Sequence, residues 1–178
     1  MMNGGQNKQT EKLKNSTSEK QNDSVDTDSR GPSIFIPPPL IVFCIILSGY
    51  GLGFLWPINI NLQWLPNLGI LLFSIGCLLA LFASQLFFRL KTSIEPWKPT
   101  SKVITQGIYR YSRNPIYLAF LFFQLGIGFY FIKFWIVLLT ALTFWILDRF
   151  VVNKEEVYLQ QKFGQEYLNY KKQVSKWI

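Results

Sequence analysis

The sequence predicts an all-α protein, a polytopic membrane bundle of about four transmembrane helices with a C-terminal amphipathic helix. Charged residues make up only 16% of the 178 residues, against about 25% in an average soluble domain. No charged side chain occurs between Gly31 and Phe88. That run is too long for one buried helix of a small soluble protein, so it is expected to cross a bilayer, turn and return.

Four apolar segments have the length or composition of membrane spans. A helix needs about 20 apolar residues to cross the hydrocarbon core of a bilayer. Trp56, Pro57 and Pro66 mark the turn between the first two segments, because proline ends helices and tryptophan favours the headgroup zone. The expected spans cover residues about 38–56, 66–88, 115–132 and 134–152. The last helix is expected to continue past Asp148 and out of the bilayer.

The first 32 residues differ in composition from everything that follows. They are rich in Asn, Gln, Ser, Thr and Lys, and their acidic and basic residues cancel. Such a segment has too little apolar surface to offset its ordering entropy, so residues 1–32 are predicted to be a disordered polar tail. A signal peptide would have its apolar segment directly after a short basic leader, so the tail is expected to stay uncleaved. Residues 33–178 are the predicted membrane domain.

The charges of the loops predict the orientation. The loop between the second and third predicted spans is strongly basic, and so is the region after the fourth. By the positive-inside rule this loop, both termini and any site built from them face the cytoplasm. If the protein is bacterial, it is expected in the inner, cytoplasmic membrane. Nucleic-acid binding is not expected from the net charge of +8, because the basic residues cluster beside apolar spans.

The region after the fourth span has helical periodicity. Its apolar residues recur at steps of three and four, which predicts an amphipathic helix over about 154–171 that lies on the membrane or folds back on the bundle. Gly164 weakens the middle of this helix and can break it. The residues of the predicted stripe are Glu155, Leu159, Phe163, Tyr167, Tyr170 and Val174.

Several kinds of catalytic site are excluded by composition. The sequence has no histidine, which excludes a histidine-based triad, a histidine-ligated metal and a histidine proton shuttle. Cys44 and Cys77 both lie within apolar runs, where free cysteine is usually a packing residue. No metal site is therefore predicted.

The polar residues that remain available lie in the long cytoplasmic loop and beside it. Asn114 precedes Pro115 at the start of the third span, Tyr117 follows one turn inside, and Glu155 and Glu156 leave the fourth helix at the same level. Each has a structural alternative: Asn114 can be a helix cap, Tyr117 an interfacial anchor, and the glutamates a solvated salt-bridge face.

The order of these segments carries a family resemblance. A Gly-x-Tyr turn, an Arg-Asn-Pro-x-Tyr helix start, a hydrophobic hairpin, a Glu-Glu pair and Phe-Gly-Gln-Glu-Tyr-Leu-Asn-Tyr follow one another within residues 89–177. The sequence resembles the isoprenylcysteine carboxyl methyltransferase and phospholipid methyltransferase superfamily, especially its small bacterial members. The resemblance implies an integral-membrane methyltransferase (EC 2.1.1 type) that uses S-adenosylmethionine. The cofactor contacts that it implies are Tyr109, Asn114, Tyr117 and Glu155, with Glu156, Gly107 and the backbone of Val103 and Ile104 as further candidates.

The acceptor of the methyl group is left open by the same comparison. The eukaryotic prenylcysteine enzymes have histidine where this chain has Asn114, commonly glycine at Ala119, and an arginine near the position of Val151. A lipophilic acceptor is expected, either an isoprenylcysteine-like carboxylate or a phospholipid amine. No substrate-binding or acid–base catalytic residue is assigned, and membrane lipids are the only partners expected besides the substrate.

Two other functions are compatible with the pattern. Membrane sterol reductases resemble this superfamily in their C-terminal half and bind NADPH there, although they have more spans. A non-catalytic membrane protein that keeps the fold is the second alternative. A transporter is less expected, because no ionisable residue lies deep inside a predicted span.

Overall fold

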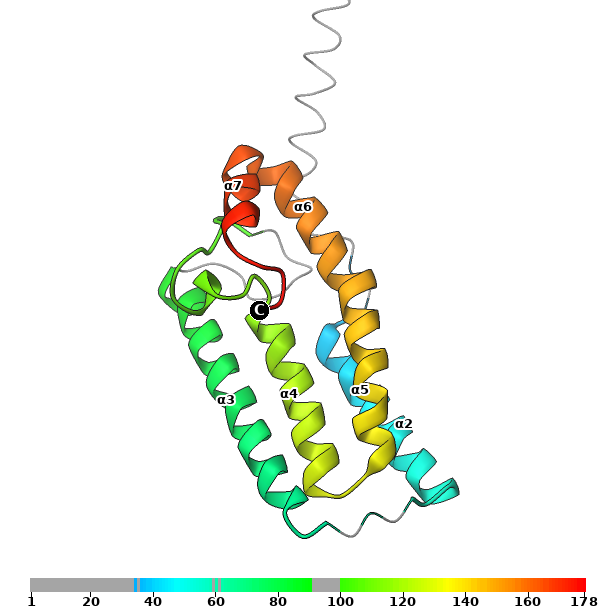
Figure 1. Cartoon of the computed structure of the whole chain (residues 1–178). Helices are drawn as coiled ribbons and strands as arrows, with labels where there is room; N and C mark the ends of the chain where they lie inside the picture. Colours follow the sequence, from blue (N-terminus) through cyan, green and yellow to red (C-terminus); the bar gives the residue numbers. More distant parts are fainter. Residues whose placement is uncertain (1–33, 35, 59, 61, 91–99) are drawn as a thin grey trace, which may run out of the picture.

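The computed structural model describes residues 34, 36–58, 60, 62–90 and 100–178, and all regular structure within these residues is helical (Figure 1). The predicted tail, residues 1–32, and part of the loop predicted to be cytoplasmic, residues 91–99, lie outside the described residues. The helices are α2 (Pro38–Leu55), α3 (Leu65–Leu90), the 3-10 turn η1 (Gly107–Arg110), α4 (Pro115–Tyr130), α5 (Phe134–Ile146), the π-helical segment η2 (Leu147–Val152), α6 (Asn153–Phe163) and α7 (Gln165–Gln173). The all-α membrane bundle is thus confirmed.

Within the described residues, three helices are long and apolar enough to cross a membrane: α2, α3 and the continuous run Phe134–Phe163. The fourth expected span, α4, is an apolar helix of 16 residues, which at 1.5 Å per residue covers about 24 Å. That length falls short of the roughly 30 Å of hydrocarbon. The predicted span 115–132 ends two residues too late, and four complete crossings stay a prediction.

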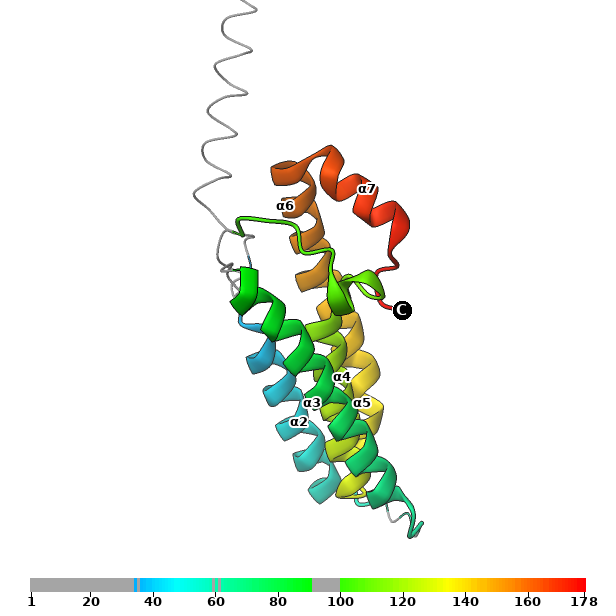
Figure 2. The ribbon, with the colours of Figure 1, turned by 90° about the vertical axis from the view of Figure 1, so that its left-hand side faces the viewer.

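The helices form an antiparallel bundle with one polar end. Helix α3 lies along α4, α2 lies along α5, and α4 and α5 are joined by a short turn (Figures 1 and 2). The end of α3, the start of α4 and the whole of α6 and α7 therefore gather at the same end of the bundle. Many large apolar side chains of the bundle helices point outwards and are exposed, as expected for a surface that faces lipid.

Glycine allows α3 and α4 to approach closely. A Cβ atom built on Gly126 of α4 would lie 2.8 Å from the backbone nitrogen of Phe73 and 2.9 Å from the carbonyl oxygen of Gly69. Both atoms belong to the backbone of α3, so neither can rotate away. Close backbone approach through small residues is a usual way to associate membrane helices, because van der Waals contact replaces the hydrophobic effect there.

One polar contact inside the bundle joins α4 to α5. The Gln124 side chain is fully buried; its Oε1 accepts a hydrogen bond from the Thr143 hydroxyl at 2.7 Å, and its Nε2 donates to the carbonyl oxygen of Ile136 at 3.3 Å. A buried amide is costly unless it is hydrogen-bonded. Both polar atoms of Gln124 are satisfied, so the residue can be explained as structural.

The predicted C-terminal helix needs a correction. Residues 154–171 do not form one separate helix: α6 continues the α5 helix through the π-helical segment, and Gly164 breaks the run before α7. Gly164 has φ 53° and ψ −122°, a backbone conformation that residues other than glycine rarely adopt. The predicted stripe is therefore divided between two helices, and α7 folds back toward the bundle (Figure 2).

Replacing Gly126 by alanine should destabilise the protein. Overpacking a well-packed contact typically costs about 1–3 kcal/mol, and the backbone atoms of α3 offer no way to relieve it. Thermal unfolding in detergent should show a clear decrease in Tm. Gly51→Ala is the control, since a Cβ at Gly51 would meet nothing within 4 Å; equal Tm values for the two variants would contradict the packing argument.

The membrane orientation can be tested by cysteine labelling. With Cys44 and Cys77 replaced by alanine, a cysteine at Leu62 should react with an impermeant thiol reagent from outside. A cysteine at Ser101 should react only after the membrane is opened, because the positive-inside rule predicts that the basic loop lies inside. The reverse pattern would show that the loop and the polar end face outwards.

Candidate functional site

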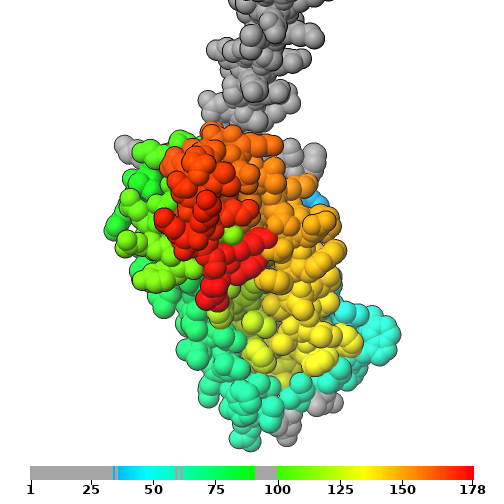
Figure 3. Space-filling view, turned by 45° about the horizontal axis from the view of Figure 1, so that its top comes forward, coloured from blue at the N-terminus to red at the C-terminus, as the bar shows by residue number. Residues whose placement is uncertain are grey.

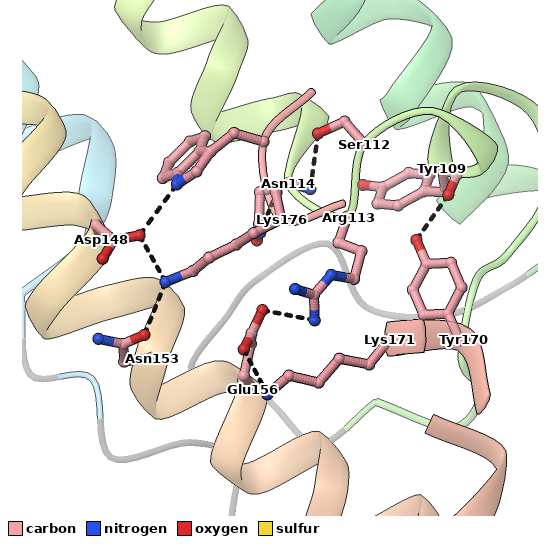
Figure 4. Close-up of polar contacts among 11 residues, drawn as sticks. Tyr109, Ser112, Arg113, Asn114, Asp148, Asn153, Glu156, Tyr170, Lys171 and Lys176 are labelled. Carbon is pink, nitrogen blue, oxygen red and sulfur yellow. Dashed lines mark hydrogen bonds and ion pairs between the residues drawn. The ribbon is translucent and has the colours of Figure 1, made fainter. Parts of the chain in front are cut away.

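Polar side chains from four parts of the sequence meet at one end of the bundle (Figure 4). They come from η1 and the residues that follow it, from the first turn of α4, from η2 and α6, and from residues 165–177, which we call the α7 segment. Because α4 and α5 form a hairpin, the first turn of α4 and the start of α6 return to the same end.

Tyr117 and Glu155 join the two ends of this hairpin. The Tyr117 hydroxyl donates a hydrogen bond to Glu155 Oε2 at 2.8 Å, although the residues are 38 positions apart. Tyr117 is buried and Glu155 is partly buried. A carboxylate can accept about four hydrogen bonds, so the bond from Tyr117 leaves Glu155 with capacity for a ligand hydroxyl or ammonium group.

Glu156 is held differently from its neighbour. Its Oε1 lies 2.8 Å from Arg113 Nη1 and its Oε2 lies 3.1 Å from Lys171 Nζ. The side chains of Arg113 and Glu156 are only 8% and 10% exposed, whereas that of Lys171 is 39% exposed. Both carboxylate oxygens are thus occupied by cations. In this structure Glu156 anchors α6 to the N-terminal turn of α4 and to α7.

Asn114 is positioned as the N-cap of α4, but its side chain does not cap the helix. Its Nδ2 instead donates a hydrogen bond at 2.9 Å to the carbonyl oxygen of Lys176. Its backbone N–H donates to Ser112 Oγ at 3.1 Å. Asn114 is therefore the N-cap residue before Pro115, but it makes no side-chain capping bond, and its amide is directed at the α7 segment.

The remaining predicted contacts lie in or before η1. Gly107 has φ 57°, and a Cβ there would lie 2.8 Å from Leu86 Cδ1, so glycine is required by the turn and its packing on α3. Ile104 is buried in an apolar cluster with Ala83 and Tyr109, while Val103 is partly buried. These residues position the loop against α3, and no contact of their side chains with Asn114 or Glu155 is seen among the described residues.

Tyr109 and Tyr170 connect η1 to α7. The Tyr170 hydroxyl donates to the carbonyl oxygen of Tyr109 at 2.7 Å in a buried contact. Burial, and then the charge of Glu155, raise the pKa of Tyr109 well above its usual value. Burial also raises the pKa of Tyr170. Both phenols therefore stay neutral at physiological pH, and the Tyr170 hydroxyl can donate its hydrogen bond.

A second polar cluster at this end was not predicted from the sequence. Lys176 Nζ pairs with Asp148 Oδ1 and donates to Asn153 Oδ1 at 2.8 Å. Trp177 Nε1 donates to Asp148 Oδ1 at 3.0 Å, and its ring lies 4.9 Å from that of Phe144. These contacts join residues more than twenty positions apart, and no local sequence pattern signals them.

The donor and acceptor set suits a zwitterionic ligand with hydroxyl groups. Glu155 can accept from hydroxyl or ammonium groups, and the Asn114 amide can donate to a carboxylate. The buried Arg113 Nε has no hydrogen-bond partner within the described part of the chain. Such an orphaned donor beside Asn114 adds a second group that could bind a carboxylate. S-adenosylmethionine carries all these groups, so the residues present fit it.

The geometry defines a class of protein, a helical membrane protein with a buried polar cluster at one end of an apolar bundle. Residues 64–166 match the family model described as phospholipid methyltransferase. The match covers more than half of the chain, so the chain belongs to the phospholipid methyltransferase family, as its resemblance indicated.

The similar curated proteins include several isoprenylcysteine methyltransferases. The chain is 31% identical over 122 residues to the protein-S-isoprenylcysteine O-methyltransferases of Rattus norvegicus and Homo sapiens, which is 67% of this chain and 43% of each relative. It is 36% identical over 76 residues to that of Schizosaccharomyces pombe, 43% of this chain and 32% of the relative. The chain thus spans less than half the length of these relatives. No solved structure matches it.

The buried ion pair should be the most sensitive polar contact of the site. Glu156→Gln leaves the buried Arg113 guanidinium without its counter-charge, and breaking a buried pair from one side costs about 3–5 kcal/mol. Unfolding in detergent should show this loss as a large decrease in Tm. The exposed Glu166→Gln is the matched control and should cost under about 1 kcal/mol. Similar losses for both variants would show that Glu156 is not a structural anchor.

Proposed function

We propose that the protein is an integral-membrane methyltransferase that binds S-adenosylmethionine at the polar end of the bundle and methylates a lipophilic acceptor. The observation that carries this proposal is the hydrogen bond between Tyr117 and Glu155. It joins the two segments that resemble the superfamily's cofactor contacts, and both lie within residues 64–166, which match the family.

When bound, S-adenosylmethionine supplies a methyl group on an activated sulfonium, so the protein has mainly to align the reacting groups and exclude water. Glu155, oriented by Tyr117, would accept from hydroxyl or ammonium groups of the cofactor. Asn114 and Arg113 Nε would donate to its carboxylate. The absence of histidine is compatible with these roles, because none of them requires a group that titrates near neutral pH.

An apolar environment beside this pair suits an apolar acceptor. Tyr117 packs in a cluster of buried apolar residues from α2, α4 and η2: Val42, Leu121, Leu147, Val151 and Val152. Partly buried apolar side chains pack around this cluster, among them Ile41, Ile46 and Phe120, and would meet the hydrocarbon chain of an acceptor that enters from the bilayer. We expect the site and both termini to face the cytoplasm, as the basic loop indicates.

The charges near Glu155 favour an amine over a carboxylate as the accepting group. Val151, near the position where the prenylcysteine enzymes have an arginine, is 1% exposed and surrounded by apolar side chains. The buried cation nearby, Arg113, is already paired with Glu156. An acceptor carboxylate would therefore lack a free counter-charge, whereas an acceptor amine could donate to the remaining acceptor capacity of Glu155.

Isothermal titration of the detergent-purified protein with S-adenosylmethionine and with NADPH tests the class of function. We expect binding of S-adenosylmethionine alone; binding of NADPH alone would favour a reductase, and binding of neither would favour a non-catalytic protein. Transfer of labelled methyl groups to an amine phospholipid and to a farnesylcysteine analogue then tests the acceptor. Labelling of the farnesylcysteine analogue alone would overturn the preference for an amine.

Asn114→Ala and Glu155→Ala should each weaken S-adenosylmethionine binding about ten- to a hundredfold. Removing one partner of a buried hydrogen bond costs about 1–3 kcal/mol, which corresponds to this range. Because both residues would contact one ligand, the double variant should lose less than the sum of the two effects. Titration calorimetry measures all three variants.

Arg149→Ala is the control for these variants, since Arg149 is exposed on the same helical run. It should bind S-adenosylmethionine like the parent protein. If Arg149→Ala lost affinity while Asn114→Ala and Glu155→Ala kept it, the assignment of the site residues would be wrong even with the family correct.

A further inference from the structure

The α7 segment lies across the proposed site and contacts each part of it. Tyr170 binds the η1 backbone, Lys171 binds Glu156, and the backbone N–H of Arg113 donates to the carbonyl oxygen of Ser175 at 3.2 Å. Figure 3 shows the segment in red, spread between the green residues that follow α3 and the yellow and orange helix. The segment thus covers the start of α4 and the first turn of η2 with its own side chains and backbone.

The last contacts of this segment converge on Asp148. Lys176 lies between Asp148 and Asn153, and Trp177 donates to the same Asp148 oxygen. The side chains of Lys176 and Asp148 are 23% and 31% exposed. Partly exposed ion pairs are weak compared with buried ones. The end of the segment is therefore fixed by contacts that can break without unfolding the bundle.

The end of the α7 segment also binds Asn114, a residue that would contact the proposed cofactor. Asn114 Nδ2 donates to the carbonyl oxygen of Lys176, so the amide faces the segment. A ligand carboxylate at Asn114 would compete with that carbonyl group. Binding of such a ligand and closure of the segment's end are consequently coupled through one side chain.

Gly164 provides a hinge for the segment. It is the single residue between α6 and α7, it has φ 53° and ψ −122°, and a Cβ there would meet nothing within 4 Å. The space beside Gly164 is open, and glycine has the widest choice of backbone angles. Hinges commonly lie at such positions between helices, where few residues absorb the change in φ and ψ.

We propose that the α7 segment is a hinged lid whose closed position is held by Lys176 between Asp148 and Asn153, and which must release Asn114 before the cofactor binds. Opening at Gly164 also releases Tyr170 from the Tyr109 carbonyl group and Lys171 from Glu156. This proposal rests on the proposed function, since it concerns the same site. In the closed lid the Lys176 carbonyl group takes the place of a ligand at Asn114. The affinity for the ligand is then reduced by the fraction of molecules that are closed.

Weakening the closed position should therefore improve binding. Lys176→Met removes the ammonium group but keeps an unbranched side chain, and Asp148→Asn removes the charge that faces it. Titration calorimetry should show a three- to tenfold decrease in the Kd for S-adenosylmethionine in both variants. Lys172→Met, an exposed lysine of the same segment, should leave Kd unchanged. An unchanged or increased Kd in Lys176→Met would overturn the lid.

A distance measurement tests the opening without any cofactor. Spin labels are placed on Lys102→Cys and Gln173→Cys, both exposed positions, with Cys44 and Cys77 replaced by alanine. Lys176→Met should add a population with a longer distance between the labels, and Lys172→Met should not. A distance distribution unchanged by Lys176→Met would exclude the lid, even if S-adenosylmethionine binds. A longer distance in Lys176→Met, with no binding of S-adenosylmethionine to the parent, would support the lid and reject the proposed function.

Discussion

A bilayer cannot supply hydrogen bonds to polar groups in its core, and this constraint divides the protein into an apolar bundle and one polar end. Inside the bundle the buried Gln124 is satisfied by Thr143 and by the backbone of α5. At the polar end the side chains form a network that reaches from η1 to Trp177. Chemistry that needs charged groups can therefore be built only where the helices leave the hydrocarbon.

The α4–α5 hairpin determines which residues meet at that end. Its two arms bring the first turn of α4 opposite the start of α6, where Tyr117 meets Glu155 and Arg113 meets Glu156. The two adjacent glutamates then have different environments, because successive residues of a helix point in directions about 100° apart. Glu156 is fixed by cations and holds the elements together, while Glu155 keeps acceptor capacity for a ligand.

Local patterns were sufficient to predict the helices but not the side-chain network. The uncharged runs located α2, α3 and α4 to within two residues. Gly164 was recognised as a possible break, because composition and backbone conformation are local properties. The same patterns placed Asn114, Tyr117 and Glu155 at one membrane level. They could not predict that Asn114 binds the Lys176 carbonyl or that Lys176 and Trp177 meet Asp148. Those contacts depend on the reversal of the chain at Gly164, whose direction has no signature in the sequence.

The difference in burial along the network gives the two kinds of contact different roles. The side chains of Arg113 and Glu156 are about nine-tenths buried. Separating the two would leave each as a buried charge without a partner, so this ion pair must stay formed whenever the protein is folded. Lys176 and Asp148 are partly hydrated, so water can replace their contact at little cost. Regions held by such contacts open at lower free energy than the core. A site that has to enclose a soluble cofactor beside a membrane needs both kinds of contact, permanent ones to position Glu155 and breakable ones to uncover Asn114.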